Sequence, residues 1–189
     1  MQRIIHYILL LCACACVYAC AQRPTTPKYN SPAQCRLDSI ITRYHIASGR
    51  EFNELALEEM FDEYHVALKD LFNSHSIQDW QAKLQSLKSS DISVNGEQYK
   101  HITFDLINGL NCTPKITFNA SYYIKNESLH NDSVYQNLKS IGNLQNVIFS
   151  GEITRGHNGS VLTVYESLET SYLMTYPTFN ITITNISAQ

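Results

Sequence analysis

The period of the hydrophobic residues changes part-way along this 189-residue chain, and this change constrains the fold more than any other feature. Between residues 57 and 71 the apolar residues recur in steps of three and four, the spacing of one helical face. After residue 112 apolar and polar residues alternate, as in a strand with one buried face. The first half is therefore expected to supply helices and the second half a sheet.

Helices dominate the expected first half. A short helix is predicted over 37–46, and a long one follows the capping-box sequence Ser-Gly-Arg-Glu at 48–51. A second helix is predicted to open at Ser76, because Ile77, Trp80, Leu84 and Leu87 share one helical side. A strand over 91–94 and an Asn95-Gly96 turn then lead to a third helix, with Tyr99, Ile102 and Leu106 on one face and Gly109 as its stop.

Strands dominate the second half. The alternation predicts them over 116–124, 145–154, 161–167, 172–176 and 179–183. A polar loop or short helix is expected over 126–143, and a Gly-rich turn over 156–159. The expected fold class is α+β, with two or three N-terminal helices packed on a curved, mainly antiparallel sheet of about four to five strands. One domain is expected over residues 35–189.

Residues 1–21 have the layout of a secretory signal peptide. Arg3 is their only charge, an apolar run follows over 4–11, and small residues at positions 19 and 21 stand just before Gln22. The run is too short for a membrane span of about 20 residues. We therefore expect a secreted protein, with a proline-rich linker over 22–34 before the folded domain.

A second interpretation of the leader stays open. Leu11-Cys12-Ala13-Cys14 resembles a bacterial lipoprotein cleavage box, in which Cys14 would carry the lipid. The same domain would then be anchored to a bacterial membrane by its N-terminus. Soluble secretion is preferred because the apolar run before Cys14 is short.

Cleavage after Ala21 would leave only Cys35 and Cys112 of the six cysteines. Two cysteines in an oxidising compartment most simply form one disulfide. Two buried free thiols are the alternative.

Asn-x-Ser/Thr triplets are frequent in the chain. Their number suggests an N-glycosylated secretory protein, but a polar bacterial surface on which the triplet has no meaning accounts for them equally well. The seven triplets begin at Asn111, Asn119, Asn126, Asn131, Asn158, Asn180 and Asn185.

The charge balance and the motifs narrow the function classes. The chain has 14 Lys and Arg against 17 Asp and Glu, a net charge of −3, and no basic cluster, which argues against nucleic acid and anionic membranes as partners. Its seven histidines lack metal-ligand spacing, and the sequence has no nucleophile elbow, phosphate loop or dinucleotide fingerprint. We expect no cofactor, no metal and no catalytic set.

The expected order of elements resembles the cone-shaped α+β fold of the nuclear transport factor 2-like superfamily over roughly residues 51–186. The best local match runs from the amphipathic helix through Ile77-Gln78-Asp79-Trp80 to residues 91–99. The resemblance implies an apolar cavity between a concave sheet and the first helix. The superfamily includes lyases and isomerases that use a cavity Asp, His or Tyr, and many non-catalytic binders. Cystatin-like folds are the nearest alternative.

Six aromatic residues on the expected inward faces could line such a pocket, or could simply fill the core. They are Phe61, Tyr64, Trp80, Tyr99, Phe118 and Tyr122.

These observations predict a secreted, non-enzymatic binding or interaction module for a small apolar ligand or a protein partner, or one that forms a homodimer. A small lyase or isomerase that uses Tyr64 with an acidic or His partner is the catalytic alternative. Its candidate partners, Asp62, His65, His101 and Asp105, lie off the expected inner faces or are ambiguous. A tethered lipoprotein acting in assembly or adhesion is the third interpretation.

Mass spectrometry of the mature N-terminus separates these interpretations. We expect pyroglutamate at Gln22, because small residues precede it at the cleavage site. A diacylglyceryl group on Cys14 would instead establish the lipoprotein.

Overall fold

Five strands close into a barrel, in the order β1–β2–β3–β5–β4 with β4 returning to β1. The computed structural model describes residues 31–51, 53–108, 114–156, 159–163 and 170–189. All neighbouring strands are antiparallel except β3 and β5, which are parallel. In chain order the elements are α2 (Pro32–Ser48), α3 (Glu54–Leu71), β1 (Ser76–Val94), β2 (Glu97–Asn108), β3 (Ile116–Lys125), the 3₁₀ turn η1 (Asn126–Ser128), α4 (Ser133–Ser140), β4 (Asn146–Ile153), α5 (Thr170–Thr175) and β5 (Thr178–Ala188).

Strand β1 joins both sides of the barrel. Its first part, Ser76–Lys83, pairs with β4, and its second part, Lys83–Val94, pairs with β2. The register shifts twice along β1, and each shift contains a residue with positive φ, Asp79 at 55° and Ser86 at 61°. Such bulges bend a strand and increase its twist, which lets one strand serve two neighbours around a closed sheet.

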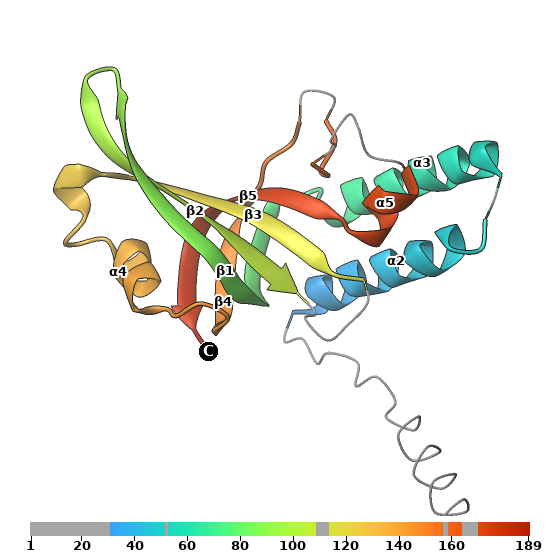
Figure 1. The fold of residues 1–189 in the computed structure, drawn as a ribbon, viewed down its shortest axis with the longest axis horizontal. Helices are drawn as coiled ribbons and strands as arrows, with labels where there is room; N and C mark the ends of the chain where they lie inside the picture. Colours follow the sequence, from blue (N-terminus) through green and yellow to red (C-terminus); the bar gives the residue numbers. More distant parts are fainter. Residues whose placement is uncertain (1–30, 52, 109–113, 157–158, 164–169) are drawn as a thin grey trace, which may run out of the picture.

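The helices lie at the two ends of the barrel (Figure 1). Helices α2, α3 and α5 pack together at one end, while α4 packs against β5 near the other. The β1–β2 hairpin extends beyond the barrel and ends in the predicted Asn95-Gly96 turn. Both turn residues have positive φ, 53° and 85°, as a two-residue type I′ turn requires.

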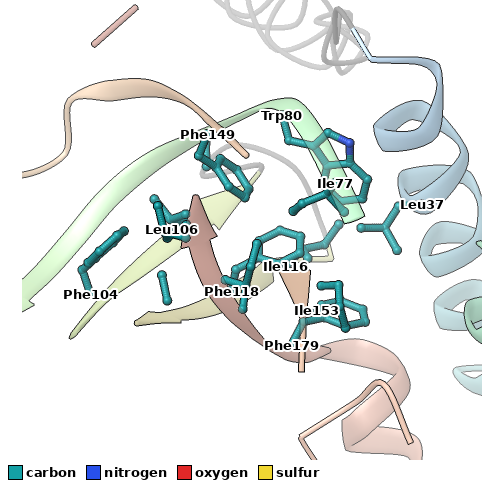
Figure 2. Close-up of a cluster of buried hydrophobic side chains, with 14 of the residues drawn as sticks. Leu37, Ile77, Trp80, Phe104, Leu106, Ile116, Phe118, Phe149, Ile153 and Phe179 are labelled. Atoms are coloured by element: carbon teal, nitrogen blue, oxygen red, sulfur yellow. The ribbon is translucent and has the colours of Figure 1, made fainter. Parts of the chain in front are cut away.

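Inward-pointing aromatic side chains fill the barrel (Figure 2). The ring of Phe118 lies at the centre of this cluster, with centroids 5.7 Å from Trp80, 5.6 Å from Phe149 and 5.4 Å from Phe179. Leu37 of α2 points toward this core from the helical end. Packing of this kind excludes water from the interior, so the barrel core is a structural element.

The fold class predicted from the sequence is confirmed. The protein is α+β, with two helices before the first strand and a curved, mainly antiparallel sheet of five strands. The predicted inner face of α3 is also correct, since Tyr64 and Leu68 are buried and Leu57, Phe61 and Leu71 pack against the core. The alternation predicted in β3 and at the start of β5 matches their buried positions.

The helix predicted from Ser76 is wrong, because this segment is the strand β1. Ile77, Trp80, Leu84 and Leu87 follow a helical spacing only because the two bulges insert extra residues. Between the bulges Trp80, Ala82 and Leu84 are buried in alternation, and Leu87 is 43% exposed.

The third predicted helix is wrong too, because residues 97–108 form β2. Ile102 and Leu106 fit a helical spacing, but Phe104 between them is also buried, which is a strand pattern. Gly109, the predicted helix stop, lies outside the described residues. Since the nuclear transport factor 2-like resemblance relied on helices in both segments, it loses the element order that suggested it.

Smaller differences lie at element ends. Helix α2 begins at Pro32, inside the predicted linker, and runs through Ser48, whose hydroxyl donates to the His45 carbonyl instead of capping the next helix. Asn53 caps α3, since its side chain accepts from the Leu55 amide.

Two predicted strands in the C-terminal part differ as well. Residues 170–175 form the helix α5 where a strand over 172–176 was predicted. Of the strand predicted over 161–167, Leu162 makes an isolated bridge to Phe179, and residues 164–167 lie outside the described part.

Gly151 of β4 tests the closure of the barrel. A Cβ there would lie 2.5 Å from the Thr182 carbonyl oxygen and 2.8 Å from Ile181 Cδ1. We expect Gly151→Ala to lower the free energy of unfolding by about 1–3 kcal/mol through overpacking, measured by urea denaturation. Gly142→Ala is the matched control, because its nearest neighbour would be 3.6 Å away. Equal stability of the two variants would contradict this packing.

Candidate functional site

The structure distributes the six predicted pocket aromatics over three places. Trp80 and Phe118 pack inside the barrel, and Phe61 and Tyr64 lie on α3 in the helical layer. Tyr99 belongs to the hairpin, where its hydroxyl donates to Glu97 over 2.6 Å. These residues therefore do not line one common pocket.

Tyr122, the sixth of these residues, lies on β3 close to α4. Its hydroxyl donates to Asp132 Oδ2 over 2.6 Å, and Asp132 Oδ1 accepts from the Tyr135 amide and so caps α4. Burial and then this hydrogen bond raise the pKa of Tyr122. The contact anchors α4 to the barrel, which is a structural role.

Tyr64, the candidate acid–base residue, is sealed in the helical layer. Its side chain is fully buried, its ring lies 5.2 Å from that of Tyr44, and its hydroxyl has no hydrogen-bond partner. Burial raises the pKa of this hydroxyl far above its ordinary value. Asp62 on the same helix is exposed, so the two groups face different environments. This geometry does not favour Tyr64 as a proton donor to a substrate.

The outer face of the barrel instead carries a polar hollow of about 470 Å³. It crosses β1, β2, β3 and β5, because the residues that point away from the barrel core on these strands are mostly polar. The polar lining residues are Ser86, Lys88, His101, Thr103, Asp105, Asn119, Ser121, Tyr123, Thr154 and Asn180.

Strand register aligns these side chains in rows across the sheet. In one row Asp105 of β2 lies opposite Asn119 of β3, which lies opposite Asn180 of β5. In the next row Thr103 lies opposite Ser121. Directly paired residues have Cβ atoms about 5 Å apart, so each row presents hydroxyl, amide and carboxylate groups at regular spacing.

An aromatic plate forms one end of this hollow. The rings of His101 and Tyr123, which are register partners, stack with centroids 4.2 Å apart and planes 3° from parallel. Tyr123 is 52% exposed, so its ring is accessible to solvent. His101 Nε2 is buried and has no hydrogen-bond partner. The hollow therefore combines an exposed aromatic ring with unused hydrogen-bonding capacity.

The charges in the hollow nearly balance. Lys88 from β1 and Asp105 from β2 are the formally charged residues that line it. Among the residues that the structure describes, no group of three or more His, Cys, Asp or Glu side chains could hold a metal ion. The arrangement suits hydrogen bonding to a polar ligand of low charge.

The predicted modification sites fall partly on this face. Asn119 and Asn180 line the hollow, with Asn180 exposed and Asn119 half-buried, while Asn131 and Asn185 are exposed elsewhere. Asn126 is half-buried, and Asn111 and Asn158 lie outside the described residues. Cys35 is an exposed free thiol here and Cys112 is not described, so their disulfide stays a prediction.

Within the described ranges no helix is both long and apolar enough to cross a membrane. Neither a known protein family nor a curated protein matches the chain in sequence. The functional argument therefore depends on the site itself.

Sequence reasoning placed only part of this hollow. It predicted the polar side of β3, including Asn119 and Ser121, but it assigned His101 and Asp105 to a helix. The signal that could have found them is the alternation of polar residues 101, 103 and 105 with apolar residues 102, 104 and 106.

Tyr64→Phe tests whether the buried hydroxyl has a structural or chemical purpose. Because the hydroxyl is buried without a partner, its removal is expected to raise the free energy of unfolding by up to about 1–3 kcal/mol. Thermal unfolding of the two proteins measures this. A clear loss of stability would mean that the hydroxyl has a hydrogen bond in solution.

Proposed function

We propose that this protein is an exported, non-enzymatic binding module that holds an oligosaccharide on the outer face of its barrel. The observation that carries the proposal is the exposed Tyr123 ring, stacked on His101 and flanked by rows of Asn, Asp, Ser and Thr side chains.

The chemistry of a sugar fits this combination. One face of a pyranose ring presents C–H groups, which pack on the electron-rich face of an aromatic ring. Its edges carry hydroxyl groups, which both donate and accept hydrogen bonds. The amides of Asn119 and Asn180 and the carboxylate of Asp105 offer complementary donors and acceptors beside the Tyr123 plate.

The architecture gives independent support by analogy. Five-stranded Greek-key barrels of the oligonucleotide- and oligosaccharide-binding type hold their ligands on the face of the second and third strands. Here His101, Thr103 and Asp105 come from β2, and Asn119, Ser121 and Tyr123 from β3. A shared architecture alone does not assign a function, so the argument also needs the side chains of the site.

Charge favours a saccharide over a nucleic acid. Barrels that bind single-stranded nucleic acid combine stacking aromatics with a positively charged groove. In this hollow Lys88 is offset by Asp105, and the whole chain has a net charge of −3. A neutral polyhydroxylated ligand meets no repulsion there.

This proposal moves the binding site from an apolar interior to the polar exterior. The expected apolar pocket would need Trp80 and Phe118 to line a cavity, but both rings pack against other core side chains. The catalytic alternative would need access to Tyr64, whose side chain is fully buried.

Replacement of Tyr123 tests the proposal on an immobilised glycan array. Tyr123→Ala is expected to weaken binding to any recognised glycan at least about tenfold, equivalent to ~1.4 kcal/mol, because the stacking surface is lost. Tyr123→Phe keeps the ring and should retain binding. Both residues lie at an exposed position, so thermal unfolding should show equal stability of the two variants.

Three outcomes would contradict the proposal. The first is no recognised glycan on an array that includes bacterial and animal polysaccharides. The second is equal binding by the Ala and Phe variants. The third is preferential binding of a single-stranded oligothymidylate, which would favour the nucleic-acid interpretation.

A further inference from the structure

We infer that a second hollow, beside α5, extends this site along β3 and β5, so that the ligand is a linear oligosaccharide bound along its length. This inference rests on the proposed function, because it adds a subsite to the same sugar-binding face.

The second hollow has a volume of about 280 Å³ and lies where α5 meets the first residues of β3 and β5. Its polar lining includes Lys115, Thr117, Thr163 and Thr178. Tyr172 and Tyr176 of this region are each 46% exposed, and their ring centroids are 5.0 Å apart. An aromatic pair next to several hydroxyls repeats the chemistry of the Tyr123 end.

The register of β3 and β5 joins the two hollows. Thr117 lies opposite Thr178 in the second hollow, and two residues further along the same strands Asn119 lies opposite Asn180 in the first. Because side chains two apart on a strand share one face, these rows are immediate neighbours on the outside of the barrel. The two hollows therefore form one polar track.

The length of the track indicates the size of the ligand. From Thr117 to Tyr123 the strand rises about 20 Å, at roughly 3.3 Å per residue. This span exceeds the length of a disaccharide, and an aromatic platform stands at each end. A chain of several sugar units could stack on both platforms and place its hydroxyls along the Asn119 and Asn180 row between them.

One further observation points to a ligand at the α5 end. Thr163 Oγ1 is buried at the edge of the second hollow and has no hydrogen-bond partner. The Thr163 amide donates to the Thr178 carbonyl over 2.8 Å, which holds the residue against β5. A sugar hydroxyl in the hollow would satisfy the free side-chain oxygen.

The test compares short and long sugars. The probes are disaccharides and linear hexasaccharides of glucose, N-acetylglucosamine, mannose and galacturonic acid, titrated against the mature protein by calorimetry and by the amide NMR signals of Tyr123 and Tyr176. A hexasaccharide that binds is expected to shift both signals, whereas its disaccharide shifts mainly that of Tyr123.

Variants at the two platforms separate the two ideas. Tyr176→Ala should weaken the hexasaccharide about tenfold and leave the disaccharide unchanged, while Tyr123→Ala should weaken both. Tyr176→Phe should behave as the wild type, and Leu144→Ala, at an exposed position outside both sets of lining residues, is the neutral control.

The outcomes distinguish the extension from the proposed function. If Tyr123 responds to sugars but Tyr176 does not, and hexasaccharides bind no more tightly than disaccharides, the extended track is wrong and the single site stands. If neither tyrosine responds to any of these sugars, the extension falls together with the proposed function.

Discussion

The double pairing of β1 is the interaction on which the rest of the structure depends. One strand hydrogen-bonds to β4 with its first part and to β2 with its second, so the sheet closes without leaving either neighbour unpaired there. The bulge at Asp79 makes the bend, and Ser150 Oγ accepts the amide proton of Asp79, which the bulge removes from the regular ladder. Closure then places aromatic side chains from β1, β3, β4 and β5 in one interior.

Closure also separates stability from recognition. Because side chains alternate along each strand, the positions that fill the core are not the positions that face solvent. Phe104 and Phe118 stabilise the barrel, while their neighbours Asp105 and Asn119 are available on the outside. Polar residues on this face can therefore change without loss of the hydrophobic core, which is a common basis for diverse ligands on one barrel architecture.

The sequence predicted the class of fold and the elements with uninterrupted patterns. Helix α3 and strand β3 were found because each holds one period over its whole length. Strands β1 and β2 were missed for physical reasons: two bulges shift the spacing of Ile77, Trp80, Leu84 and Leu87 toward a helical one, and tertiary pairing overrides local pattern in β2. The candidate site was missed with them, since a row such as Asp105, Asn119 and Asn180 exists only after strands far apart in sequence are paired.

The parallel pairing of β3 with β5 has a consequence for how the chain reaches this structure. Thr117 must find Thr178, and β5 must enter between β3 and β4 before the barrel can close. Contacts between such distant residues form slowly, because the entropy of closing a long loop is lost before the contacts stabilise it. A chain with this topology would stay open until β5 has emerged, which suits passage across a membrane in an unfolded state and folding on the far side.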